Sequence, residues 1–472
     1  MPNPTPGTGN QSLAQFGPEP SFGAGGSPIY RVELVEWKVD PVPEEILDDS
    51  LYGGVSRRAS FQGPFSLVGT AKFRIGFEGF EELVRGAFGT VATTNVNASP
   101  LVNDHVIKET PTLRSYQWEV SEGGAATFRY TGVKLSDPEL DITAGPNASG
   151  MIHIACKVWA KDCVEAPFST LSVANGATTS GSALVTRPSG SFVSDGVRAG
   201  MTIAGTNIPA GATVLSVDTA TQITISANAT GTGTALALTF TPNFPTPRAI
   251  LYGHAITAHD GIADTLPTLV NVSACSTTNA STTLTTAGDF TAAGVKAGML
   301  ITGTNIPAGT TVVSVGTTTL VMSAAATGTG SSLTMRFDSQ GRIRSVNLKF
   351  SQPHAEDRDY MGAFNRDEPL RNDYAEPEMT IVEEFVHGRA YAAARAYTVG
   401  TPRFVFREVS PITGAFYREF EFRLGNAQLT KLSKPVSGYG IMTQTLTWRG
   451  NNASADGSSV VVRIRSQAAA LV

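Results

Sequence analysis

One stretch of this chain occurs twice. Residues 205–211 and 303–309 both read GTNIPAG, at an offset of 303 − 205 = 98. The similarity extends further, because VRAGM at 197–201 matches VKAGM at 295–299, and ATGTG at 229–233 returns at 326–330. Self-similarity at a fixed spacing indicates internal duplication, so the chain contains two copies of one module of about seventy residues.

Each copy is predicted to be a small all-β module. Segments 213–217 (TVLSV) and 222–226 (QITIS) alternate apolar and polar side chains and contain β-branched residues, which favours strands. The Pro and Gly residues of the repeated motifs are typical of turns. Most side chains are small and uncharged, and none has catalytic chemistry. The module is either a displayed accessory domain or a spacer, and both interpretations stay open.

Length and charge limit the remaining possibilities. A chain of 472 residues is too long for one hydrophobic core, so several domains are expected. Its net charge of −5 disfavours tight binding to a nucleic-acid backbone, which requires a basic surface. Cys156, Cys163 and Cys275 lack CxxC spacing and are expected to be free thiols. Residues 1–28 lack the apolar segment of a signal peptide, which predicts a flexible arm on a protein made in a cytoplasm.

The two flanks of the repeated region share one pattern. The first has a strand at 29–37, a long polar stretch at 40–62, a strand at 65–75 and an amphipathic helix at 77–88 before Gly89. The second has a strand at 342–350, a charged stretch at 351–377, a strand at 378–385 and an Ala-rich helix at 389–399 before Gly400. Further strands are expected at 115–120, 125–135, 140–143 and 151–159, and at 403–409, 416–424, 427–432 and 441–448.

This pattern predicts a mostly β (α+β) chain. We expect two tandem β-sandwich or barrel domains, each with one packed helix, and two small inserted all-β modules. The expected segments are a flexible N-terminal arm (1–28), a first domain (29–165), module 1 (168–241), a strand or linker of the second domain (245–267), module 2 (268–338) and the second domain (339–465). A coincidental similarity between two β-rich domains is the alternative.

The long charged stretches are the candidate functional segments, because long loops inside compact domains are uncommon. Mixed charges at a subunit boundary contribute register and specificity more than affinity. We therefore predict inter-subunit contacts at Arg57, Arg58, Arg358, Asp359, Arg366, Asp367 and Arg371. A solvated surface is the simpler alternative.

No pattern of an enzyme is present in the sequence. A nucleophile elbow, an HExxH motif and a P-loop are all missing. His254, His259 and Asp260 form the only cluster resembling metal ligands, and on an extended strand the two imidazoles face opposite sides. We therefore expect no catalytic activity, no cofactor and no metal.

The element order of the flanks resembles that of the tail tube proteins (major tail proteins) of bacteriophages with long, non-contractile tails. The resemblance rests on GPFSLVGT at 63–70 with FEELVRGAFG at 80–89, and on FRYTGVKL at 128–135. It extends loosely over residues 1–165 and 245–465. The GTNIPAG modules resemble the Ig-like repeats of phage structural proteins.

The resemblance implies a curved sheet that lines a tube, a helix packed outside it, and subunits that join into stacked rings through sheet edges. The usual ring has six such domains, so three chains with two domains each (3 × 2 = 6) would form a pseudo-hexameric ring, and a trimer is favoured over a hexamer. The implied partners are the chain itself, the tail terminator and tail tip proteins, and the tape measure protein and DNA in the lumen. The DNA would pass an acidic inner wall without tight binding.

The implied setting is the virion tail, assembled in the host cytoplasm, where the tube serves as a conduit for DNA ejection. The modules would project outward as decoration. The alternative is a phage surface adhesin whose Thr-rich modules bind a receptor or host surface glycans. The duplicated, helix-bearing flanks favour the structural interpretation, because an adhesin needs only strings of β modules.

Overall fold

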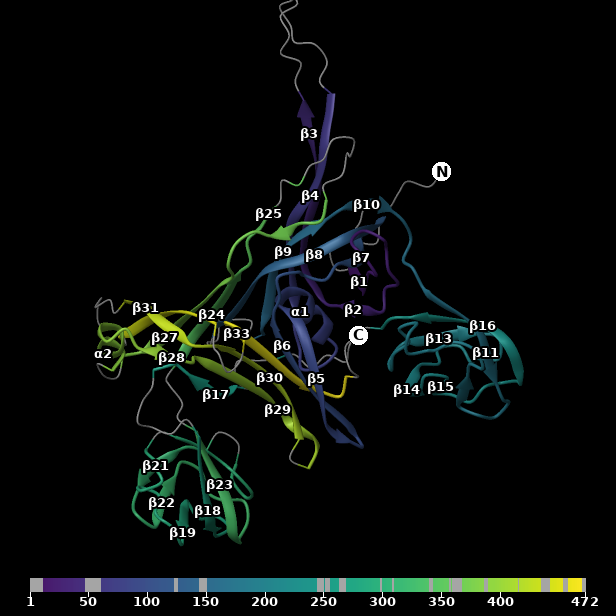
Figure 1. The fold of residues 1–472 in the computed structure, drawn as a ribbon. Helices are drawn as coiled ribbons and strands as arrows, with labels where there is room; N and C mark the ends of the chain where they lie inside the picture. Colours follow the sequence, from purple (N-terminus) through teal and green to yellow (C-terminus); the bar gives the residue numbers. More distant parts are fainter. Residues whose placement is uncertain are drawn as a thin grey trace, which may run out of the picture.

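The computed structural model describes residues 12–46, 61–122, 126–143, 151–243, 250, 255–262, 269–297, 299–307, 310–338, 343–355, 358, 367–385, 389–414, 416–433, 442–452 and 457–468. Within these residues the chain is mostly β, with two short helices, as the sequence predicts (Figure 1). No helix in the described part is long and apolar enough to cross a membrane.

Eight antiparallel strands form one continuous run in the main sheet, in the order β3-β4-β9-β8-β24-β27-β32-β31. The first four are β3 (Leu34–Ile46), β4 (Phe61–Arg74), β9 (His153–Ala160) and β8 (Ala126–Thr143). The last four are β24 (Ile343–Ser351), β27 (Glu376–Glu384), β32 (Thr443–Arg449) and β31 (Ala427–Ser433). The first half of the body (β1–β10) and the second half (β17 and β24–β33) therefore contribute four strands each, in the same order.

The two halves also share an irregularity of the ladder. The β3–β4 register shifts between Leu34 and Glu36, and the β24–β27 register shifts between Ile343 and Ser345. A bulge of this kind bends the strand and increases its twist. Matching the bulges gives an offset of 345 − 36 = 309, which makes Asp40 the counterpart of Lys349.

A second sheet has the order β17-β29-β30-β33-β6-β5. Its strands are β17 (Ala255–His259), β29 (Arg403–Thr413), β30 (Phe416–Leu424), β33 (Val460–Ser466), β6 (Leu101–Glu109) and β5 (Gly89–Ala98). β17 pairs with β29, so the strand predicted within 245–267 does join the second half. β5, β6 and β33 were not predicted.

Both helices are shorter than the sequence suggests. Helix α1 (Glu81–Phe88) begins four residues later than predicted, because Gly79 adopts a φ of 83° that interrupts the helix. Helix α2 (Arg389–Arg395) ends early, and Tyr397 follows it at a φ of 53°. Two-residue strands are β25 (His354–Ala355), β26 (Leu370–Arg371) and β28 (Val399–Gly400).

A single hydrophobic core fills the body. It contains buried residues of both halves, among them Phe73, Phe88, Phe350 and Trp448. Phe88, the last residue of α1, stacks on Phe350 of β24 with ring centroids 5.7 Å apart. The two halves are therefore joined through a common core and not by a linker alone.

Part of the expected N-terminal arm is a strand. β1 (Leu13–Pro18) lies between β2 (Tyr30–Val32) and β7 (Tyr116–Glu122), and β10 (Asp162–Glu165) pairs with β8. Phe16 is 1% exposed and stacks on Trp118 at 4.6 Å between centroids. The burial of this ring fixes residues 13–18 on the sheet, which corrects the prediction for them. Residues 1–11 lie outside the described residues.

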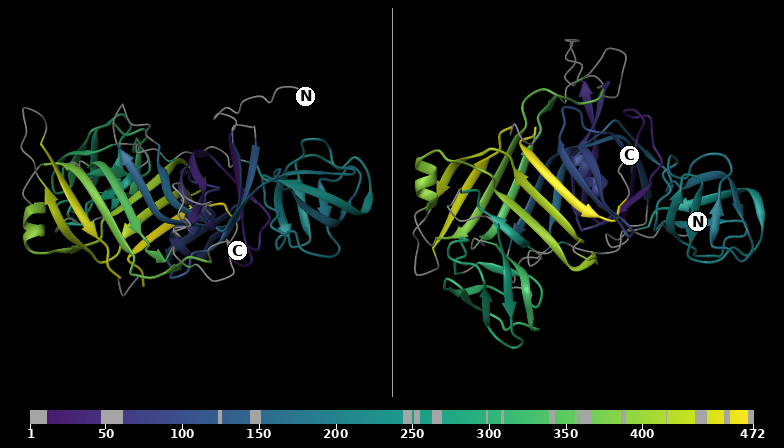
Figure 2. Two further views of the ribbon diagram at one scale, coloured as in Figure 1. Left: turned by 90° about the horizontal axis from the view of Figure 1, so that it is seen from above. Right: turned by 60° about the horizontal axis from the view of Figure 1, so that its bottom comes forward.

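The two modules have the same topology. Module 1 has the order β13-β16-β11-β12-β15-β14 and module 2 the order β20-β23-β18-β19-β22-β21. Module 1 contains β11 (Leu171–Thr178), β12 (Leu184–Thr186), β13 (Thr202–Gly205), β14 (Val214–Thr219), β15 (Gln222–Ile225) and β16 (Gly233–Thr241). Module 2 contains β18 (Leu269–Thr277), β19 (Thr283–Thr286), β20 (Leu300–Thr302), β21 (Val312–Val315), β22 (Thr319–Met322) and β23 (Gly330–Asp338). Both lie outside the central body and apart from each other (Figures 1 and 2).

Candidate functional site

The repeated GTNIPAG motif has a structural role in both modules. Asn207 and Asn305 adopt φ angles of 67° and 66°, in the left-handed region that Asn tolerates better than most residues. Asn207 Nδ2 donates to Thr178 Oγ1 at 3.3 Å, and its carbonyl accepts from the Thr230 amide at 2.9 Å. Asn305 contacts Thr277 and Thr327 in the same way. The motif therefore joins the two repeated segments of each module, which explains the duplication without a ligand.

Four of the seven predicted inter-subunit residues, Arg57, Arg58, Asp359 and Arg366, lie outside the described residues. The other three, Arg358, Asp367 and Arg371, belong to the connection between β24 and β27. We call its described part, residues 352–355, 358 and 367–371, the strap. Arg371 Nη1 donates to the carbonyl of Thr110 at 3.2 Å, which links the strap to the first half. The described residues of this segment, which were predicted to contact another subunit, therefore lie at the boundary between the two halves of one chain.

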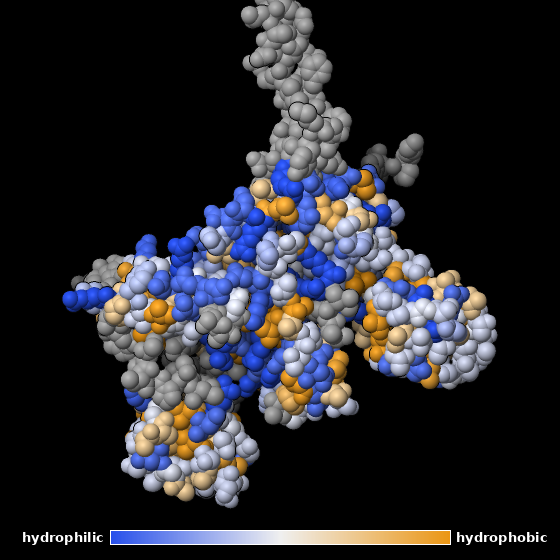
Figure 3. Space-filling model, viewed as in Figure 1, coloured by the Kyte–Doolittle hydropathy of each residue, from blue (hydrophilic) through white to orange (hydrophobic). Residues whose placement is uncertain are grey.

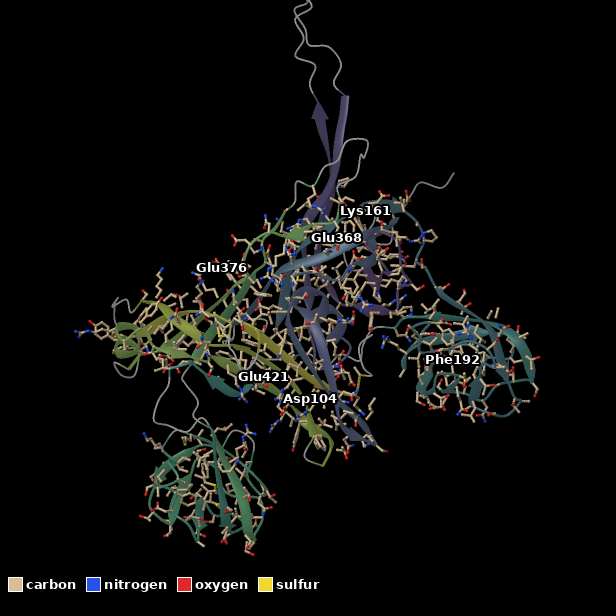
Figure 4. All side chains as sticks on the ribbon, viewed as in Figure 1. Asp104, Lys161, Phe192, Glu368, Glu376 and Glu421 are labelled. Carbon is tan, nitrogen blue, oxygen red and sulfur yellow. The ribbon has the colours of Figure 1, made fainter. Side chains whose placement is uncertain are left out.

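An ion pair between a buried lysine and a partly exposed glutamate holds the strap in place. Lys134 of β8 is fully buried, and its Nζ lies 2.5 Å from the Oε1 atom of Glu368, the residue of the strap that Figure 4 labels. Burial lowers the pKa of Lys134, and the Glu368 carboxylate opposes that shift. Arg358 donates to the Glu368 carbonyl and lies 3.5 Å from Asp367. Removal of the Glu368 charge would leave Lys134 buried without compensation, so this contact favours the observed position of the strap.

The seam between the halves of the main sheet is a ladder of β8 and β24. Five residue pairs are in register, from Ser345 with Thr143 to Lys349 with Glu139. Glu139 Oε1 accepts a hydrogen bond from Asn347 Nδ2 at 2.7 Å and lies 3.4 Å from Lys349 Nζ. Side-chain contacts therefore reinforce the backbone pairing across the seam.

One row of paired residues alternates in charge as it crosses this seam. Glu139 is opposite Lys349, Lys349 is opposite Glu378, and Glu378 is opposite Arg449. Opposite charges on neighbouring strands are mutually stabilising. This row of the sheet therefore carries both signs of charge.

The second sheet has a seam of its own, where β33 pairs with β6. Arg465 of β33 donates two bonds to Asp104 of β6, at 2.6 and 2.8 Å. Arg463 lies 4.0 Å from Asp104 and 2.9 Å from Glu421 of β30, so the charges form a connected network (Figure 4). Two ladders and the common core thus fix the halves relative to each other.

The eight-strand run of the main sheet ends at β3 and β31. Among the described strands, β3 pairs only with β4, whereas β31 is partly covered on its outer side, where β28 pairs with Gln428 and Ala427 and the amide of Leu429 donates to the carbonyl of Thr398 at 3.5 Å. Open strand edges present unpaired backbone groups that can pair with another chain. The sequence did not reveal these edges or the seams, because no local pattern states which distant strand is a neighbour.

The residues that could act as metal ligands are not grouped in the described part of the chain. No group of three or more His, Cys, Asp or Glu side chains there could hold a metal ion. His259 ends β17 and Asp260 is buried, whereas His254 lies outside the described residues. In the space-filling view the most hydrophilic surface covers the body, and the modules are paler with hydrophobic patches (Figure 3).

No protein-family model matches the chain, and no curated protein is similar enough in sequence to be a relative.

Proposed function

We propose that this protein is a structural virion subunit that polymerises into stacked rings and forms the tail tube of a phage, a conduit for DNA ejection. The observation that carries the proposal is the repeated four-strand order of the main sheet, which ends at β3 on one side and at the partly covered strand β31 on the other. Within the chain, one four-strand unit already pairs with the next at β8 and β24. Such a unit is suited to the same kind of pairing between chains. Contacts of this head-to-tail kind generate a ring when the rotation closes.

The doubled unit favours three chains per ring, because 3 × 2 = 6 units would then form a pseudo-hexamer. The subunit would be made in the host cytoplasm and end in the virion tail. Its other partners would be the tail terminator, the tail tip and the tape measure protein, with DNA passing through the lumen. The mixed charges of the row at Glu139 and Lys349 suit passage without tight binding, since this row offers no continuous run of basic side chains.

Negative-stain electron microscopy of the concentrated, purified protein tests this function. We expect rings or tubes with a central channel and outward knobs at the positions of the modules. Top views with three knobs of each kind would establish the trimer. A protein that stays dispersed at every concentration, with and without preformed tail tips as initiators, would contradict the proposal.

A second candidate function is binding of a host glycan or receptor by the modules. It is favoured by one shared feature: Leu215 of β14 and Val313 of β21 occupy equivalent bulged positions and are 58% and 56% exposed. Exposed apolar side chains at the same place in both copies suit a binding surface. Glycan-array binding by the wild-type protein, lost in the Leu215→Ser/Val313→Ser variant, would support this function.

A further inference from the structure

We propose that module 2 binds an extended segment of a partner protein, at the surface where module 1 holds Ile29 and Tyr30 of the body. The partner segment would carry a large aliphatic residue followed by an aromatic one. This inference does not rest on the proposed function, because it is drawn from a comparison of the two modules alone. The surface is formed by other residues than Leu215 and Val313.

In module 1 this surface is occupied by the segment that leads into β2. Ile29 is 8% exposed and belongs to the hydrophobic core of module 1. Its Cγ2 atom lies 2.8 Å from the position that a Cβ on Gly196 would take, so only a glycine leaves room for it. The ring of Tyr30 faces Arg198, whose Cζ is 4.9 Å from the ring centroid. An aliphatic anchor and a cation–π contact therefore hold the segment.

Module 2 repeats the residues that form this surface. Segments 196–201 (GVRAGM) and 294–299 (GVKAGM) differ only at Arg198 and Lys296, and both of these side chains are cationic. The backbone is repeated as well, because the glycine that begins each segment has a positive φ, 90° in module 1 and 86° in module 2. The glycine and the cation that receive the two side chains in module 1 are thus present in module 2.

The two copies of the surface differ in what occupies them. Arg198 is partly buried and lies over Tyr30, whereas Lys296 is exposed. The core of module 1 includes Ile29 of the body, but in the described part of the chain every member of the module 2 core comes from that module. The surface is therefore filled in module 1 and available in module 2.

The second half of the body does not supply an equivalent segment. The offset of 309 between the shared bulges puts Asp338 and Ser339 at the positions of Ile29 and Tyr30 (29 + 309 = 338 and 30 + 309 = 339). An acidic and a hydroxyl side chain cannot replace an aliphatic anchor followed by an aromatic ring. The surface of module 2 is therefore left for a segment of another protein.

The occupied copy also defines the conformation and strength of binding. Tyr30 begins strand β2, and the amide of Ile29 donates to the carbonyl of Phe16 at 2.9 Å, so the bound segment is extended. Two anchoring side chains give a weak single site, with a Kd on the order of 1 mM. Several copies that act together on one partner would strengthen the overall binding.

Methionine methyl signals in nuclear magnetic resonance spectra report on both surfaces in the intact protein. Met201 and Met299 belong to the cores of the two modules, and the amide of Lys296 donates to Met299 Sδ at 3.3 Å. The full chain is isotopically labelled at its methionine methyl groups, and a capped peptide with the sequence of residues 27–33 (SPIYRVE) is added. We expect the Met299 signal to shift and saturate. The Met201 signal should not move, because Ile29 already occupies its surface.

Substitutions in the peptide and in the module test the two anchors. A peptide with Ile29→Ala/Tyr30→Ala should leave the Met299 signal in place. Lys296→Glu should weaken binding of the unchanged peptide by about two- to fivefold, because the aromatic ring loses its cation. Lys296→Arg should strengthen it, since a guanidinium also stacks on aromatic rings. Equal shifts of Met299 with both peptides would indicate unspecific binding and overturn the proposal.

The same double substitution in the full chain supplies a matched control. The Ile29→Ala/Tyr30→Ala protein has an empty surface on module 1, so the peptide should now shift Met201 as well as Met299. Thermal unfolding confirms that this variant is folded. A shift of Met201 alone would show that module 2 lacks a working surface, and no shift of either signal would show that neither module binds the segment from solution. Either result would overturn the proposal.

Discussion

The guanidinium of Arg198 lies over the ring of Tyr30, 4.9 Å from its centroid, and joins module 1 to the body of the protein. Ile29, beside Tyr30, is part of the hydrophobic core of module 1. Among the described residues, the core of module 2, in contrast, contains only members of the module itself. Two copies of one module are therefore attached differently, and module 1 has the firmer attachment.

Arg198→Ala should loosen module 1 without unfolding it. A partly desolvated cation–π contact contributes about 1–2 kcal/mol, enough to shift a docking equilibrium about tenfold. Small-angle X-ray scattering should show a larger radius of gyration and a broader distance distribution. The control is Lys296→Ala, because Lys296 occupies the equivalent position in module 2 (296 − 198 = 98). Equal scattering from both variants would show that the Arg198–Tyr30 contact does not hold the module.

Asn207 should contribute to the stability of module 1 in two separable ways. Asn207→Gly keeps the left-handed backbone but loses the bond to Thr178, which costs about 1 kcal/mol. Asn207→Ala loses the bond and adds strain, for a total of about 2–3 kcal/mol. Hydrogen exchange resolved by peptide should show faster exchange in module 1 only. Asn305→Ala should produce the same effect in module 2 only, and equal effects of Gly and Ala would exclude the strain contribution.

Glu119 should be among the most sensitive positions of the body. Its buried carboxylate accepts hydrogen bonds from Gln15 at 2.7 Å, Gln117 at 3.1 Å, Arg129 at 2.9 Å and the amide of Ser169 at 2.6 Å. It thereby ties β1 and the segment leading to module 1 to β7. Glu119→Ala should cost about 3–5 kcal/mol, because Arg129 and several donors lose their acceptor. Urea unfolding measures the loss, and Glu122→Ala, at the exposed end of the same strand, should change it little.

Local signals in the sequence account for what could be predicted. The module copies were found because seven identical residues recur, and the strands of the flanks because their apolar residues alternate. Helix α1 was placed by its apolar stripe, although Gly79 delays its start. Each of these signals is contained within about ten residues, over which side-chain period and turn chemistry are informative.

The long-range contacts could not be predicted in this way. Glu139 and Lys349 are 210 residues apart (349 − 139 = 210), and neither has neighbours in the sequence that indicate the other. Phe16 lies in a segment rich in Pro and Gly, so its burial against Trp118 has no periodic signal. Arg371 lies in the short strand β26 of the connection between β24 and β27, and its contact with Thr110 depends on how the halves pack.

Two buried titratable groups should affect stability with opposite dependence on pH. Burial lowers the pKa of His105 to about 4, with Asp104 partly opposing the shift. Burial raises the pKa of Glu81 to about 7, and a hydrogen bond with Ser466 partly offsets it. His105 is thus held neutral and Glu81 is held protonated at mildly acidic pH.

The sign of each contribution follows from proton linkage. Below pH 6.5, the ordinary pKa of histidine, His105 is protonated more in the unfolded state than in the folded state. The contribution of His105 to the free energy of unfolding is therefore full above pH 6.5 and is lost as the pH falls towards 4. The folded state retains the Glu81 proton more strongly, so that stability is full below pH 4.5 and is lost as the pH rises towards 7. The two contributions partly cancel in the wild-type protein.

Single substitutions should separate the His105 and Glu81 contributions to stability. In Glu81→Gln the free energy of unfolding should increase with pH between 4 and 6.5, and near pH 8 this variant should exceed the wild type by up to about 3 kcal/mol. In His105→Asn the free energy should instead decrease between pH 4.5 and 7, because only the Glu81 contribution remains. Urea unfolding at half-unit steps of pH measures both profiles. Profiles parallel to the wild type in both variants would show that neither group changes its protonation on folding in this range.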